Sequence, residues 1–117
     1  MTARLTLGNL TIDRSTYLVS IDGVPIDLTY IEFEILYTLA RNQQRVTPRE
    51  AIAHSAWGDG HRNHTRNLTV HISRLRKKLK GSHPFAIRTI PKRGYSITNI
   101  KQPAHHLDTE LTGVTQG

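Results

Sequence analysis

The sequence predicts an α+β fold in which a small antiparallel sheet comes first, three helices follow, and a β-hairpin completes the domain. Three observations support this order. Apolar and polar residues alternate over residues 4–28, which is the period of half-buried strands. Three helical patterns lie between residues 29 and 80, and strand-like alternation returns over residues 86–97. A chain of 117 residues is long enough for one domain with a modest core.

The first 28 residues predict short strands separated by tight turns. Gly8-Asn9 and Asp22-Gly23 are turn dipeptides, and the second is a strong hairpin signal. This region contains no cluster of catalytic side chains, so we interpret it as scaffold. The alternating apolar residues are Leu5, Leu7, Leu10, Ile12, Tyr17, Val19, Ile21, Val24, Ile26 and Leu28.

The first helix has a clear start. Thr29 and Glu32 form a capping-box pattern, in which the hydroxyl and the carboxylate each accept a hydrogen bond from a backbone N–H. The buried side of this helix is then predicted to consist of Ile31, Ile35, Leu36 and Leu39.

A second, shorter helix is predicted to begin at a similar pattern. Thr47 and Glu50 are spaced as a second capping box, with Pro48 at the first helical position. Trp57 and Gly58 end this helix, and Ile52, Ala53 and Ala56 form its apolar side.

The third helix, residues 65–80, carries an apolar stripe opposite a cationic face. At about 100° per residue, Arg66, Val70, Ser73 and Lys77 lie opposite the stripe. Six Lys or Arg and no Asp or Glu fall in this segment. Such a helix fits the major groove of DNA, although a solvated basic face would show the same pattern. The stripe consists of Leu68, Ile72, Leu75 and Leu79; Asn67, Thr69, Arg74 and Lys80 flank the cationic face.

The net charge of +7 is concentrated in the second half of the chain. Residues 51–101 hold eleven Lys or Arg and one acid, whereas residues 1–50 hold five Arg and six acids. This distribution predicts a polyanionic partner, which composition alone leaves open among nucleic acid, an acidic protein and an anionic membrane surface.

The segments on either side of the basic helix are polar. Residues 58–64 are predicted to form a loop. We interpret its histidines, His61 and His64, as polar loop groups or phosphate-facing donors rather than metal ligands, because no acidic or cysteine ligand accompanies them. After the helix, residues 86–90 and 95–97 predict two strands joined by a basic tip, residues 91–94. We expect residues 1–100 to form the domain and residues 101–117 to be a disordered tail or linker.

Composition argues against several functional classes. The absence of cysteine excludes disulfides, thiol catalysis and cysteine-based zinc sites, and it makes a cytoplasmic protein the simplest inference. No run of apolar residues reaches the length of a membrane span, and no signal peptide opens the chain. The acids lie in turns or at helix starts, so we expect no enzyme, cofactor or metal.

Four phrases together carry a family resemblance: D-G-V-P-I-D-L-T-Y-I-E-F-E-I-L, A-W-G, V-H-I-S-R-L-R-K-K-L and I-R-T-I-P-K-R-G-Y. In order and spacing, the stretch from Leu5 to Ile97 resembles the OmpR/PhoB-type winged-helix DNA-binding domain, over about four-fifths of the chain. The resemblance implies a winged helix-turn-helix fold and sequence-specific binding of double-stranded DNA by a bacterial transcription regulator.

The resemblance also implies roles for particular residues. Helix 65–80 would enter the major groove, Thr89 would hold a phosphate, and Arg62 with Trp57 would approach the sugar-phosphate backbone. Tyr95 would either pack at the base of the wing or touch phosphate. For Trp57, too, packing in the core is an alternative to contact with the DNA backbone. The DNA-binding residues that we predict are Arg62, Arg66, Asn67, Thr69, Val70, Ser73, Arg74, Lys77, Thr89, Lys92, Arg93 and Tyr95.

The chain departs from the family pattern at the wing. Many response regulators have an Arg where this chain has Pro91, so Lys92 and Arg93 must supply the charge. The phrase I-P-K-R-G-Y is closest to the ToxR/CadC-like branch, yet no membrane span follows and no receiver domain precedes. The chain is therefore a free-standing effector domain or a fragment of a larger regulator.

Two alternatives remain open at this point: an architectural or silencing DNA binder with little base specificity, and a winged-helix protein-interaction module. The expected partners are double-stranded DNA, RNA polymerase, and a second copy bound head to tail on direct repeats.

Overall fold

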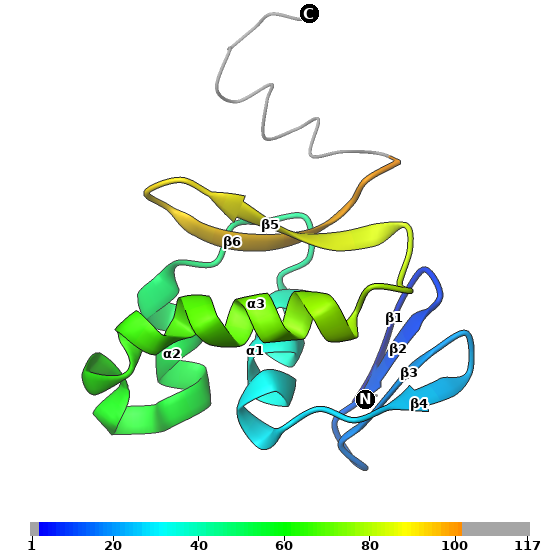
Figure 1. Cartoon of the computed structure of the whole chain (residues 1–117), viewed down its shortest axis with the longest axis horizontal. Helices are drawn as coiled ribbons and strands as arrows, with labels where there is room; N and C mark the ends of the chain where they lie inside the picture. Colours follow the sequence, from blue (N-terminus) through cyan, green and yellow to red (C-terminus); the bar gives the residue numbers. More distant parts are fainter. Residues whose placement is uncertain (1–2, 102–117) are drawn as a thin grey trace, which may run out of the picture.

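The protein folds as a four-stranded antiparallel sheet, three helices and a two-stranded C-terminal hairpin, which confirms the predicted α+β winged helix-turn-helix (Figure 1). The computed structural model describes residues 3–101, apart from the side chains of residues 61–63. The predicted tail beyond residue 101 lies outside the described residues. In chain order the elements are β1 (Arg4–Leu7), β2 (Leu10–Asp13), β3 (Leu18–Ile21), β4 (Val24–Ile26), α1 (Tyr30–Arg41), α2 (Arg49–Trp57), η1 (Gly58–Asn63), η2 (Thr65–Asn67), α3 (Leu68–Lys78), β5 (Phe85–Ile90) and β6 (Gly94–Asn99).

The N-terminal sheet has the simple strand order β1-β2-β3-β4, with each strand antiparallel to the next. Its alternating sequence buries Leu7, Leu10, Ile12 and Val19 on one face, as predicted. The β3–β4 turn has positive φ at both Asp22 and Gly23, the geometry that Asp-Gly favours in a two-residue hairpin. The sheet lies at one end of the helical region (Figure 1).

The capping box predicted for α1 is present. The Glu32 N–H donates to the Thr29 hydroxyl at 3.1 Å, and the Thr29 N–H donates to the Glu32 carboxylate at 2.9 Å. Phe33, Ile35, Leu36 and Leu39 are buried in the core. Ile31, predicted among the buried residues, is only half-buried.

The prediction of a second capping box, at Thr47 and Glu50, is wrong. α2 begins at Arg49 with Pro48 as its N-cap, and the buried Thr47 hydroxyl has no hydrogen-bond partner among the described residues. Instead, Thr47 and Tyr95 form an isolated antiparallel bridge, in which each N–H donates to the other's carbonyl, at 2.7 and 3.0 Å. Thr47 thus joins the hairpin rather than capping the helix. The predicted end of α2 at Trp57 and Gly58 is correct.

The basic helix is shorter than predicted but oriented as expected. A 3₁₀ turn, η2, precedes the α-helical part, and the preceding segment predicted as a loop is largely the 3₁₀ helix η1. The predicted apolar stripe is buried and packs in the main core with α1, which confirms the helical wheel. The buried stripe residues are Leu68, Ile72, Leu75 and Leu79.

The hairpin is seated against the chain just before α2. Strands β5 and β6 pair from Phe85↔Asn99 to Ile90↔Gly94, so they are longer than the predicted segments. Gly94 has φ of +141°, and a Cβ at this position would overlap the Thr47 carbonyl oxygen. Two features therefore require glycine at this position: the positive φ and the close approach of the Thr47 carbonyl.

We predict that Gly94→Ala destabilises the protein by roughly 1–3 kcal/mol, because the substitution strains φ and pushes Thr47 away from the hairpin. Gly60→Ala is the matched control, since open space surrounds that position and its φ is not positive. Urea denaturation of both variants measures the difference. Equal midpoints for the two variants would contradict the close approach.

Candidate nucleic-acid interface

The polar face of α3, together with Arg66 in the preceding turn η2, forms an exposed cationic surface. Arg66, Ser73, Arg74 and Lys77 are all exposed, and α3 contains no Asp or Glu. Val70 lies among them with 47% of its surface exposed. An exposed apolar side chain among cations suits contact with a thymine methyl group, beside hydrogen bonds to base edges.

The two ends of this surface are polar. Asn67 and Thr69 are exposed at the start of the helix. The Thr69 hydroxyl accepts a hydrogen bond from Arg49 Nη2 at 3.3 Å, and the same nitrogen donates to the Thr65 carbonyl at 3.1 Å. A side chain at the start of α2 therefore holds the first turns of the predicted recognition helix.

Not every cation of the segment belongs to the exposed surface. Lys78 Nζ donates to the buried Glu32 carboxylate at 2.7 Å, which ties α3 to the cap of α1. Burial raises the pKa of Glu32, but the hydrogen bonds from Lys78 and the Thr29 N–H outweigh it, so the pKa lies below its ordinary value. Glu32 thus stays ionised, and this ion pair is structural.

The wing presents two further cations. Lys92 and Arg93 are exposed in the turn between β5 and β6, next to the exposed Pro91. Lys92 has φ of 66°, and the Arg93 N–H donates to the Ile90 carbonyl at 2.9 Å, which closes the turn. The turn therefore holds both basic residues at the tip of the hairpin.

Of the two roles considered for Tyr95, packing at the base of the wing and contact with phosphate, its surroundings favour packing. Its side chain is only 3% exposed, and its hydroxyl accepts a hydrogen bond from Arg49 Nη1 at 2.9 Å. The guanidinium groups of Arg49 and Arg76 lie 5.7 and 5.9 Å from the centre of its ring. The predicted phosphate contact of Tyr95 is disfavoured, because the ring and hydroxyl are already enclosed by the protein.

Arg76 connects the helix to the wing. Its Nε and Nη2 donate to the Ile87 carbonyl at 3.2 and 3.1 Å, and Nη2 also donates to the Thr89 hydroxyl at 2.8 Å. Thr89 is exposed, so its hydroxyl is oriented by Arg76 at the surface where a phosphate was predicted. We call Arg49, Arg76 and Tyr95 the arginine bracket.

Sequence reasoning missed the two arginines of this bracket. Arg49 was interpreted only as part of a helix start, and its partner Tyr95 is 46 residues away. Arg76 had a usable signal, because its position on the helical wheel lies between the apolar stripe and the cationic face.

Trp57 and the nearby histidines pack together. The half-buried Trp57 ring stacks on the His64 ring, with 5.0 Å between the ring centroids. It also meets the His71 ring edge-on, with 5.4 Å between the centroids. Arg62 is in η1, and its side chain lies outside the described part of the structure. Among the described residues, no group of three His, Asp or Glu is placed to hold a metal ion. No helix within residues 3–101 is long and apolar enough to cross a membrane.

Comparison with known proteins places these features in context. The family model described as "Transcriptional regulatory protein, C terminal" matches residues 23–97. The heme response regulator HssR of Staphylococcus aureus is 32% identical over 98 residues, which are 83% of this chain and 44% of HssR. The chain therefore spans less than half the length of the curated relatives it matches.

Two solved structures are similar throughout the domain. The RstA DNA-binding domain of Klebsiella pneumoniae, solved in complex with the RstA box, has a TM-score of 0.70 and 32% identity, covering 82% of this chain and 97% of that one. DrrB of Thermotoga maritima, described as an OmpR/PhoB homolog, has a TM-score of 0.69 and 33% identity, covering 82% of this chain and 44% of that one.

We predict that Arg49→Lys loosens the start of α3 relative to the wing, because an ammonium cannot bond the Tyr95 hydroxyl and the Thr65 carbonyl with the geometry of a guanidinium. The expected loss is about 1–2 kcal/mol of unfolding free energy, with faster amide exchange at Thr47 and Tyr95. Arg45→Lys, at an exposed position before α2, is the control. Unchanged exchange in Arg49→Lys would show that the bracket does not hold the wing.

Proposed function

Because the chain belongs to the OmpR/PhoB-type family of transcriptional regulatory C-terminal domains, we propose that it binds double-stranded DNA sequence-specifically as part of a bacterial transcription regulator. The observation that carries the proposal is the cationic face of α3, which lies opposite the buried apolar stripe of the same helix and contains no carboxylate. DNA presents a matching polyanion and a major groove wide enough for one helix.

The proposed contacts divide by chemistry. Arg66, Asn67, Val70 and Arg74 read base edges in the major groove, because they combine donors with an apolar side chain on one exposed surface. Thr69, Ser73 and Lys77 lie beside them and contact the nearest phosphates. Arg62 and Thr89 contact the flanking sugar-phosphate backbone, and Lys92 with Arg93 contact phosphates or the adjacent minor groove.

The rival functions fit the surface less well. A protein-interaction module would present a neutral or apolar α3, whereas the exposed face here is strongly cationic. The family is a class of transcription regulators, and we propose no catalysis. An architectural binder would use the same cations without base readout, so the test must separate affinity from specificity.

The setting proposed for this function is the bacterial nucleoid in the cytoplasm. Binding of two copies head to tail on direct repeats and contact with RNA polymerase are part of the proposal. The sequence resemblance to the family supports both.

The deciding experiment selects binding sites from random duplexes at two salt concentrations and then compares variants. Arg74→Ala should weaken binding to the selected site by roughly 1–3 kcal/mol while weakening random duplexes less. Arg45→Ala, also exposed but outside the proposed interface, is the control. Thermal melting should be similar for both variants, since Arg74 does not belong to the buried stripe.

Three results would count against the proposal. Failure to enrich any motif would favour an architectural binder, and equal losses on selected and random duplexes would make Arg74 a phosphate contact only. Unchanged binding to both duplexes would remove α3 from the interface.

A separate prediction concerns the wing. Replacing both Lys92 and Arg93 by Ala should reduce the slope of log affinity against log salt by up to about two contacts, at ~0.9 each. The major-groove part of the selected motif should stay the same, because the minor groove distinguishes A·T from G·C only coarsely. An unchanged slope with an altered motif would mean that the wing reads sequence.

A further inference from the structure

The turn between β1 and β2 lies against the connection from α3 to the wing. The Asn9 N–H donates to the His83 carbonyl at 2.9 Å, and the His83 N–H donates to Asn9 Oδ1 at 2.7 Å. Asn9 Nδ2 also donates to the Gly81 carbonyl at 3.1 Å. The side-chain bonds join residues that are 74 and 72 positions apart. One asparagine of the N-terminal sheet therefore holds the segment that leads into β5.

Gly8 permits this close approach. It has φ of +62°, and a Cβ at this position would overlap the His83 carbonyl oxygen. Gly23, in the β3–β4 turn of the same sheet, has φ of +80°, but open space surrounds it. The two glycines thus share the left-handed backbone region and differ in one respect, which is the contact with the wing connection.

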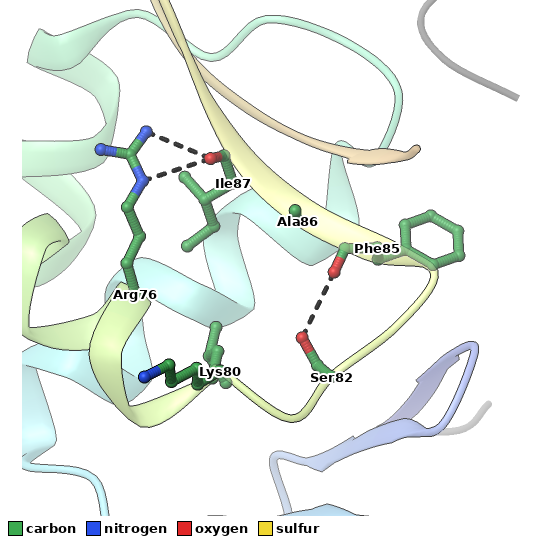
Figure 2. Close-up of a pocket in the computed structure, with 7 residues that line it drawn as sticks. Arg76, Lys80, Ser82, Phe85, Ala86 and Ile87 are labelled. Carbon is green, nitrogen blue, oxygen red and sulfur yellow. Dashed lines mark hydrogen bonds between the residues drawn. The ribbon is translucent and has the colours of Figure 1, made fainter. Parts of the chain in front are cut away.

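The connection, residues 81–84, leads directly into the hairpin, and we call it the wing root. β5 begins at Phe85, immediately after it. Figure 2 shows Ser82 Oγ donating to the Phe85 carbonyl, at 3.2 Å, with the blue strands of the N-terminal sheet beside this segment. At the other side of the hairpin, the Ile100 N–H donates to the Pro84 carbonyl at 2.7 Å. A displacement of the wing root is therefore passed to both strands.

The wing has anchors at both of its ends. The bridge between Thr47 and Tyr95 lies beside Gly94, near the tip, whereas Asn9 holds the root. The ends of β5 are about 17 Å apart along the strand, and Ile87 packs in the core between them. A hairpin held at one end can pivot, so two separated anchors fix its direction as well as its position.

We propose that Asn9, with Gly8 beside it, is a positioning residue for DNA binding. The β1–β2 turn sets the direction in which the hairpin presents Lys92 and Arg93 to DNA, and this inference rests on the proposed function. The N-terminal sheet, interpreted from the sequence as scaffold, thereby contributes to affinity without touching DNA. Loss of the turn contact removes phosphate contacts of the wing and leaves those of α3 in place.

The test compares two charge-neutral variants of the turn with two matched controls. Gly8→Ala places a methyl group against the wing root, and Asn9→Ala removes the side-chain bonds to it. Gly23→Ala is the control for a strained φ, since nothing lies close to that glycine. Ser15→Ala is the control for a lost polar side chain, because its hydroxyl bonds within the β2–β3 turn, at the opposite end of the sheet.

Two measurements on the full chain separate anchoring from DNA binding. Amide exchange at Ile100, whose N–H donates to the Pro84 carbonyl, reports on the wing root without DNA. The slope of log affinity against log salt, on a random 20-base-pair duplex, counts phosphate contacts. A loss of global stability removes folded molecules rather than contacts, so it does not by itself lower this slope.

Both turn variants should speed exchange at Ile100 roughly fivefold, the equivalent of one lost hydrogen bond. They should lower the salt slope by about one to two contacts, at ~0.9 each, whereas both controls should keep the slope of the unmodified chain. Adding Asn9→Ala to the variant that lacks Lys92 and Arg93 should lower the slope no further, because the turn acts through those two cations.

Several results would overturn the positioning role. One is an unchanged slope in both turn variants, even with faster exchange at Ile100. An equal fall of the slope in Gly23→Ala would assign the effect to the sheet as a whole, and a further fall in the combined variant would mean that the turn does not act through the wing. If the unmodified chain binds no duplex, the proposed function fails, and unchanged exchange in the turn variants would separately show that the turn does not hold the wing root.

Discussion

The geometry of the proposed interface depends on one backbone pair, Thr47 with Tyr95. This pair seats the hairpin against the chain before α2, and the missing side chain at Gly94 permits the contact. The arginine bracket surrounds it: Arg49 extends from α2 to the first turn of the recognition helix, and Arg76 extends from α3 to β5. These polar contacts, together with the packing of Ile87 and Ile97 in the same apolar core as the α3 stripe, hold the wing in place against the helix. Preorganised surfaces of this kind bind with less loss of conformational entropy.

The features that sequence predicts well are those whose determinants are close together in the chain. The cap of α1 was predictable because Thr29 and Glu32 satisfy each other within one turn, and the stripe from Leu68 to Leu79 repeats at helical spacing. The same reasoning failed at Thr47, because its backbone pairs with a residue 48 positions later. The predicted site residues on α3 are exposed as expected, whereas the support from Arg49 involves a tertiary contact that no local pattern contains.

Charge shows the same division between local pattern and tertiary structure. The six cations of residues 65–80 are equivalent in a composition count, but they have different partners in the fold. Lys78 pairs with Glu32, and Arg76 bonds the wing. The other four, Arg66, Arg74, Lys77 and Lys80, are exposed. A buried carboxylate on a different helix thus removes one cation from the surface available to a polyanion. Net charge predicts the class of partner, and the three-dimensional arrangement selects which cations meet it.

The contact between Arg76 and Ile87 also bears on how copies of the protein behave toward each other. β6 lies between β5 and the Thr47 bridge, so β5 forms the outer edge of this small sheet. Open edges invite strand pairing between molecules, which leads to aggregation. The guanidinium occupies the Ile87 carbonyl on β5 with two donors. One side chain therefore both positions the wing and obstructs intermolecular strand addition, so the solubility of the domain and the placement of its wing are physically linked.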